Sequence, residues 1–62
     1  MKYYNATLTG NTTICFKSYD SLYELRNELM NRNSILVKDV HGEELLIMAY
    51  NLITIRPSEG DW

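Results

Sequence analysis

Alternating apolar and polar residues at the start of the chain predict two β-strands. The segment 2–9 is rich in tyrosine and threonine, which favour strands, and its apolar side chains recur at every second position. The segment 12–17 continues the alternation and places Cys15 on the face opposite to its apolar residues. Gly10 and Asn11 separate the two segments, and glycine supplies the positive φ that a two-residue hairpin turn needs. We therefore expect an N-terminal β-hairpin.

The apolar period changes from two to between three and four after this hairpin, which predicts one α-helix. Its apolar stripe consists of Leu22, Leu25 and Leu29, with Tyr19 one turn earlier and Met30 beside it. Ser18, Asp20 and Ser21 are all suitable N-caps, and Ser21 with Glu24 matches a capping box. We favour a start at Ser18, because this start includes Tyr19 and Leu22 in the helix. The helix should end at 31–33, where asparagine tolerates the left-handed conformation of a C-terminal cap.

Three further strands complete the predicted fold, at 35–40, 43–50 and 52–56. A turn at 39–42 joins the first two, since aspartate opens such a turn and glycine takes a position that disfavours a side chain. Pro57 ends the last strand because proline cannot donate a hydrogen bond to a neighbouring strand. The element order is therefore β-β-α-β-β-β, which predicts an α+β fold with one helix packed on a mostly antiparallel sheet.

The fourth predicted strand is apolar on both faces, whereas a half-buried strand would alternate. Leu46, Met48 and Tyr50 face one way, and the residues between them are apolar too. Such a strand should be central and covered on both faces, but a single helix covers only one. Either the sheet curls into a small SH3-like barrel, or a second copy of the chain covers the other face. We favour a homodimer, with a candidate interface of Leu46, Met48, Tyr50, Tyr3 and Trp62.

The chain of 62 residues is long enough for one small domain, residues 1–62, with a short polar tail at 58–62. Trp62 in this tail either folds back onto an apolar patch or binds a partner, and we favour folding back. The predicted core consists of Leu8, Ile14, Phe16, Leu22, Leu25, Leu29, Ile35, Val37, Leu45, Ile47 and Ile53.

Composition excludes the usual covalent and metal supports of a domain this small. One cysteine cannot form an intramolecular disulfide, and one histidine with that thiol falls short of the four ligands of a structural zinc site. Neither Cys15 nor His41 belongs to a catalytic motif, so we expect both to be structural or exposed residues. The sequence therefore predicts no enzymatic activity, no cofactor and no metal, and it leaves subunit association as the remaining support.

Charge and hydropathy limit the partners. The net charge of −2 opposes binding to a polyanion. The N-terminal hairpin is nevertheless locally basic and rich in tyrosine, so Lys2, Tyr3 and Lys17 are the contacts of an alternative nucleic-acid-binding function. The longest apolar stretch, 45–50, is far shorter than the ~20 residues of a membrane helix, and no secretory signal is visible. We expect a cytoplasmic protein that does not contact membranes.

Two weak resemblances accompany these patterns. The segment 35–57, running from Ile-Leu-Val-Lys-Asp-Val to Ile-Arg-Pro, is similar in its alternation to part of the LytTR-type DNA-binding domains, without their basic contact residues. The opening Met-Lys-Tyr-Tyr is similar to antitoxins of the HicB type, without their glycine-containing segment. In length and lack of catalytic residues the chain resembles accessory proteins of phages or mobile elements. We expect a non-enzymatic module that binds protein partners or itself.

Overall fold

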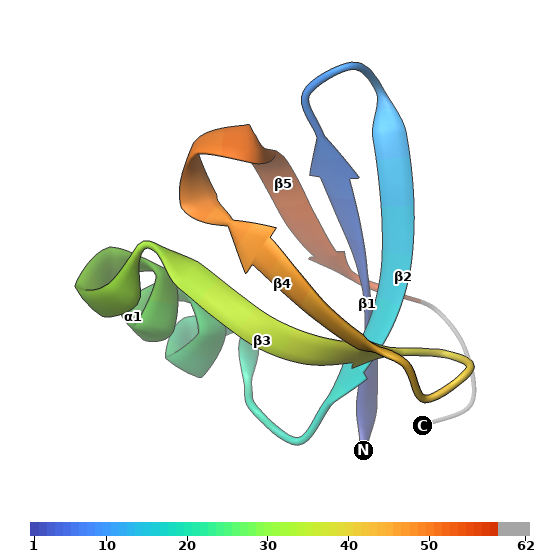
Figure 1. The fold of residues 1–62 in the computed structure, drawn as a ribbon. Helices are drawn as coiled ribbons and strands as arrows, with labels where there is room; N and C mark the ends of the chain where they lie inside the picture. The colour runs from blue at the N-terminus through green and yellow to red at the C-terminus, as the bar shows by residue number, and fades with distance from the viewer. Residues whose placement is uncertain (59–62) are drawn as a thin grey trace.

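The fold is one antiparallel sheet of five strands with one α-helix packed against it, as the sequence predicts (Figure 1). The structure is a computed structural model and describes residues 1–58. Its elements are β1 (Lys2–Leu8), β2 (Thr12–Ser18), α1 (Leu22–Arg32), β3 (Ser34–Asp39), β4 (Glu44–Met48), the 3₁₀ helix η1 (Ala49–Asn51) and β5 (Leu52–Pro57). Within the described part, no helix is long and apolar enough to cross a membrane.

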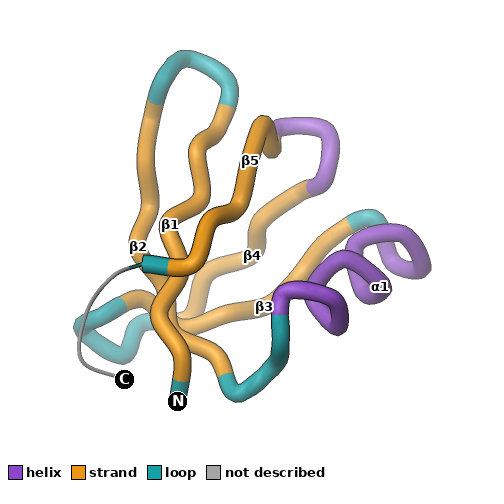
Figure 2. The backbone as a smooth tube through the Cα atoms, turned by 180° about the vertical axis from the view of Figure 1, so that it is seen from behind, coloured by secondary structure: helices purple, strands orange, loops and turns teal. Residues whose placement is uncertain are grey.

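The strand order is β4-β3-β2-β1-β5, so β4 and β5 are the two edges of the sheet. The sheet is not closed into a barrel, and the expected alternative of an SH3-like barrel is not realised. β2 and β3 pair over a short stretch, Phe16 with Asp39 and Lys17 with Lys38. Beyond that stretch the β3–β4 hairpin runs at an angle to β1 and β2 (Figures 1 and 2). The short junction therefore turns one half of the sheet relative to the other.

Positive φ angles occur in both hairpin turns, as the sequence predicts. Between β1 and β2, Gly10 has a φ of 86° and Asn11 a φ of 64°. Between β3 and β4, the carboxylate of Asp39 accepts hydrogen bonds from the N–H groups of His41 (2.8 Å) and Glu43 (2.9 Å). These hydrogen bonds lower the pKa of Asp39 because they stabilise its charged form, and the one from the Glu43 N–H has the largest effect.

The helix begins later than the sequence analysis favoured. Ser21 is the N-cap and forms a reciprocal capping box with Glu24. The N–H of Ser21 donates to Glu24 (2.8 Å), and the N–H of Glu24 donates to the Ser21 hydroxyl (3.1 Å). A start at Ser18 is wrong because Ser18 ends β2 and its hydroxyl accepts a hydrogen bond from the N–H of Asp20. At the other end, Asn33 is the left-handed C-cap, with a φ of 61°.

The core lies between the helix and the inner face of the sheet. Its buried members are Tyr4, Ala6, Phe16, Leu25, Ile35, Val37 and Ile47. Tyr4 and Ala6 were absent from the predicted core, whereas the predicted core residues Leu22 and Ile53 are exposed. The ring of Tyr4 stacks on Phe16 with centroids 5.4 Å apart, and its hydroxyl donates to the Asp20 carbonyl oxygen (2.6 Å). Burial, and then the nearby carboxylates of Asp20 and Glu24, raise the pKa of Tyr4.

The prediction of a central fourth strand is wrong. β4 is an edge strand and ends at Met48, because the chain turns into η1 at Ala49. Its inner face is covered as predicted, since Ile47 is buried in the core. On its outer face, Leu46 lies opposite Leu36 of β3, and both are exposed. Leu36 and Leu46 are thus uncovered in the described part of the chain.

Candidate functional site: an apolar groove between α1 and β5

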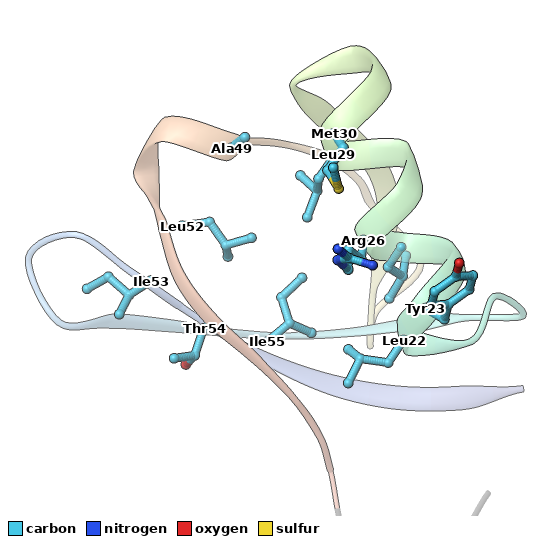
Figure 3. A pocket seen from close by; sticks show the side chains of 11 residues that line it. Leu22, Tyr23, Arg26, Leu29, Met30, Ala49, Leu52, Ile53, Thr54 and Ile55 are labelled. Atoms are coloured by element: carbon cyan, nitrogen blue, oxygen red, sulfur yellow. The ribbon is translucent and has the colours of Figure 1, made fainter.

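An apolar groove of about 730 Å³ lies between α1 and β5. We call it the α1–β5 groove (Figure 3). One wall is the exposed side of α1, and the other is formed by η1 and β5. Its lining residues are Leu22, Tyr23, Leu25, Arg26, Leu29, Met30, Ala49, Leu52, Ile53, Thr54 and Ile55.

α1 carries more apolar side chains than the sheet covers, and those left uncovered form the helical wall of the groove. Leu25 faces the core and is buried, whereas Leu29 is half-buried. Leu22 and Met30 extend the apolar surface along the helix, and 65% of the Met30 side chain is exposed. Solvent-exposed apolar side chains that adjoin one another are typical of a surface that another molecule covers.

The opposite wall follows the edge of β5. Four consecutive residues, 52–55, line the groove. Because successive side chains of a strand point to opposite faces, a groove lined by consecutive residues runs along the strand's edge and not over one face. β1 occupies the other edge of β5. The groove therefore lies beside the edge of β5 that pairs with no other strand of residues 1–58.

The pairing of β5 with β1 identifies the backbone groups at this free edge. The N–H of Ser58 donates to the carbonyl oxygen of Tyr3 (2.8 Å). Alternate residues of an antiparallel strand point their N–H and C=O groups to the same side, so those of Arg56 also face β1. The N–H and C=O of Ile55 and the C=O of Pro57 then face the free edge. Pro57 fits there, because it has no N–H to pair.

The register of β5 shifts within the groove. Thr54 pairs with Thr7 but Leu52 pairs with Leu8, so Ile53 is an additional residue on β5. Such β-bulges are common at sheet edges and redirect side chains. The Ile53 side chain is 57% exposed at the groove, which explains why it does not belong to the core.

Of the described residues that line the groove, Arg26 alone is charged. Figure 3 shows its side chain on the helical wall of the groove. Within residues 1–58 it forms no ion pair, and it lies over the ring of Tyr23, 6.0 Å from the centroid. A cation without a counter-charge at an apolar groove favours an anionic group on whatever occupies the groove.

A smaller cavity of about 340 Å³ adjoins this groove at Leu22, where Lys2, Tyr4 and Pro57 complete its lining. The pKa of nearby Glu24 is lowered, mainly by the hydrogen bond from the Ser21 N–H and then by the interaction with the Ser21 hydroxyl. The positive charge of Lys2 lowers it further, but more weakly.

The predicted self-association residues do not form one patch. Leu46 and Met48 share the outer face of β4, where Leu46 is 62% exposed and Met48 is half-buried. Tyr50 is exposed but lies in η1. Tyr3 lies on β1, separated from β4 by β2 and β3. Trp62 lies outside the described residues.

The predicted nucleic-acid contacts lie at the open end of the N-terminal hairpin, where β1 begins and β2 ends. Tyr3 pairs with Lys17, which pairs with Lys38 of β3. Lys38 in turn pairs with Glu44, so a carboxylate ends this row. Lys2 is exposed and also borders the smaller cavity.

Cys15 and His41, which the sequence predicts to be structural or exposed residues, lie in different parts of the fold. Cys15 is half-buried on β2, and His41 is exposed in the turn after β3. Hydrogen bonds within residues 1–58 do not join the two. The same residues contain no group of three or more His, Cys, Asp and Glu side chains that could hold a metal ion.

Sequence reasoning missed the α1–β5 groove, although two signals pointed to it. Leu22 and Ile53 are apolar residues in excess of what one helix and one sheet face bury, and both line the groove. That both line one groove depends on the pairing of β5 with β1, which joins opposite ends of the chain. No protein-family model, curated protein or solved structure matches this chain.

Proposed function

We propose that this chain is a small non-enzymatic protein-binding module whose binding surface is the α1–β5 groove. The observation that carries the proposal is the groove itself, which is apolar, open and of a volume typical of ligand sites. Covering its exposed apolar side chains gains roughly 25 cal/mol for each Å² removed from water. Exposed leucine, methionine and isoleucine at one site favour a protein segment as the occupant.

A peptide-display selection tests this function. We expect a library of random twelve-residue peptides to yield sequences that bind the wild-type protein. Met30→Asp places a charge on the helical wall without disturbing the core, because Met30 is largely exposed. It should abolish binding of the selected peptides. The matched control is Tyr19→Asp, at an exposed aromatic residue outside the groove, and it should leave binding unchanged. Failure of the selection, or peptides insensitive to Met30→Asp, would refute the proposed function.

We also propose self-association through the outer face of the β3–β4 hairpin. The specific support is the cross-strand pair of Leu36 and Leu46, which are 65% and 62% exposed. Two copies of such a face are self-complementary about a two-fold axis, as in most homodimers. This surface lies on a different part of the sheet from the α1–β5 groove, so the two functions are compatible.

A further inference from the structure

We propose that the α1–β5 groove binds an extended peptide segment that pairs with the free edge of β5 as a sixth strand and sets a carboxylate against Arg26. This inference rests on the proposed protein-binding function and specifies the conformation and charge of the partner. It follows from three observations at one site: a free strand edge, apolar walls and an unpaired cation.

The backbone N–H and C=O groups at the free edge of β5 can form hydrogen bonds with the backbone of a bound segment. The N–H and C=O of Ile55 face away from β1, as argued from the hydrogen bond between Ser58 and Tyr3. A peptide in the extended conformation satisfies both groups, because its own N–H and C=O groups alternate with the same period. Peptide recognition by strand addition combines such main-chain hydrogen bonds with pockets for alternate side chains. A helical segment has its backbone groups paired internally and leaves the edge unsatisfied.

The walls determine which side chains the added strand carries. Its residues that point toward α1 meet Leu29 and Met30, together with Ile55 from β5 (Figure 3). Those residues should be apolar, except for one acidic residue at the position that meets Arg26 of the same helix. The residues between them point to the opposite face of the sheet, toward solvent, and should be polar. The partner therefore alternates apolar and polar positions.

Charge complementarity distinguishes a foreign segment from a second copy of the chain. Arg26 is the charged residue of the groove and has no ion pair within residues 1–58. An isologous contact would bring the same cationic groove to itself and offer no carboxylate to Arg26. A peptide with one aspartate or glutamate forms a charge-assisted hydrogen bond there, shielded by apolar neighbours. The occupant is thus an extended, alternating segment with an acidic residue.

Two features of β5 limit how long the pairing is. The bulge at Ile53 interrupts the edge on one side, and Pro57, which lacks an N–H, limits it on the other. Bulges and prolines also protect edge strands from unlimited pairing. The groove should therefore accept one short strand, and the side-chain contacts with α1 should determine which sequence binds.

The display selection reports on this inference through the sequences that it enriches. We expect apolar residues at every second position, with one acidic residue among these α1-facing positions. Enrichment of apolar residues spaced by three and four would overturn the inference, because that spacing identifies a helical occupant. Such a result would still support protein binding, provided that Met30→Asp abolished it. The selection therefore distinguishes failure of this inference from failure of the proposed protein-binding function.

The carboxylate contact is tested with variants of Arg26 and a synthetic selected peptide, using fluorescence polarisation. Arg26→Gln should weaken binding about tenfold or more, the loss expected for one charge-assisted hydrogen bond. The matched control Arg32→Gln changes an exposed arginine of the same helix that does not line the groove, and affinity should not change. A repeated selection on Arg26→Glu should enrich lysine or arginine in place of the acidic residue. Equal affinity for Arg26→Gln and wild type would contradict the carboxylate contact.

Backbone methylation of the same peptide tests the strand pairing. N-methylation removes an N–H donor, so methylation at positions of one parity should abolish binding, whereas methylation at the other parity should leave it unchanged. Tolerance of methylation at every position would show that the peptide does not pair with β5 and would overturn the inference.

Discussion

Tyr4 links three parts of this small fold at the scale of a single residue. Its ring is 2% exposed and stacks on Phe16 of the neighbouring strand. Its hydroxyl reaches the carbonyl oxygen of Asp20, in the segment that leads into the helix. A buried hydroxyl needs such a partner, because an unsatisfied polar group costs free energy. One side chain therefore ties β1 and β2 to the start of α1.

Tyr4→Phe should lower the free energy of unfolding by about 1 kcal/mol, because it removes one hydrogen bond and keeps the ring in place. Urea denaturation of the variant and the wild type measures this difference. Tyr19→Phe is the control, since Tyr19 is exposed and its variant should unfold at the wild-type urea concentration. A Tyr4→Phe variant as stable as wild type would show that the hydrogen bond to Asp20 adds nothing.

Acid should destabilise the fold through Asp39 and Glu24. Backbone N–H donors lower the pKa of both carboxyl groups in the folded state. A lowered folded-state pKa stabilises the protein above the pKa of the unfolded chain, about 4, and this contribution is lost as the pH falls through the folded-state value. The melting temperature should therefore fall below about pH 4. The fall should be smaller in Asp39→Ala, whose melting temperature is already reduced at neutral pH.

Local signals determine the ends of most elements, and nonlocal contacts determine the rest. The capping box of Ser21 and Glu24 and the left-handed Asn33 set the ends of α1, and both are visible in the sequence. The end of β4 was not visible there, because Ala49 and Tyr50 continue an apolar run that a strand also accommodates. In the structure, the N–H of Ala49 donates to Asn33 at the end of the helix (2.9 Å). That contact is between distant segments and has no sequence signature.

Ser21→Ala should lower the free energy of unfolding by about 1 kcal/mol, the usual loss for an N-cap serine. Thermal or urea denaturation followed by circular dichroism checks this value. The matched control is Ser34→Ala, because the Ser34 hydroxyl forms no hydrogen bond within residues 1–58. Its free energy of unfolding should stay close to that of wild type, and a loss as large as that of Ser21→Ala would contradict the cap.

At the scale of the whole molecule, pairing between the two ends of the chain creates both the fold and the groove. The sequence predicted the element order and the antiparallel sheet. It did not predict that β5 pairs with β1, because alternation shows which face of a strand is buried but not which strand lies beside it. Leu22 and Ile53 therefore looked like core residues, and their role as walls of a groove emerged only from the arrangement of strands and helix.

Self-association belongs to the same scale. The wild-type protein should sediment as a dimer at micromolar concentration, because pairing two outer faces buries Leu36 and Leu46. Leu46→Asp should sediment as a monomer with an unchanged circular dichroism spectrum, since Leu46 is exposed in the single chain. Met30→Asp, which changes an exposed residue of the α1–β5 groove, should remain a dimer. A wild type that stays monomeric at millimolar concentration would contradict this interface and leave the α1–β5 groove unaffected.

An amide chemical-shift map tests most directly the claim that the α1–β5 groove is the binding surface. The ¹⁵N-labelled wild-type protein is titrated with a peptide selected by display. The account predicts that the largest shift changes occur along β5 and along α1, with the backbone amide of Ile55 among them. Largest changes on the outer face of β3 and β4, with β5 and α1 unchanged, would contradict it.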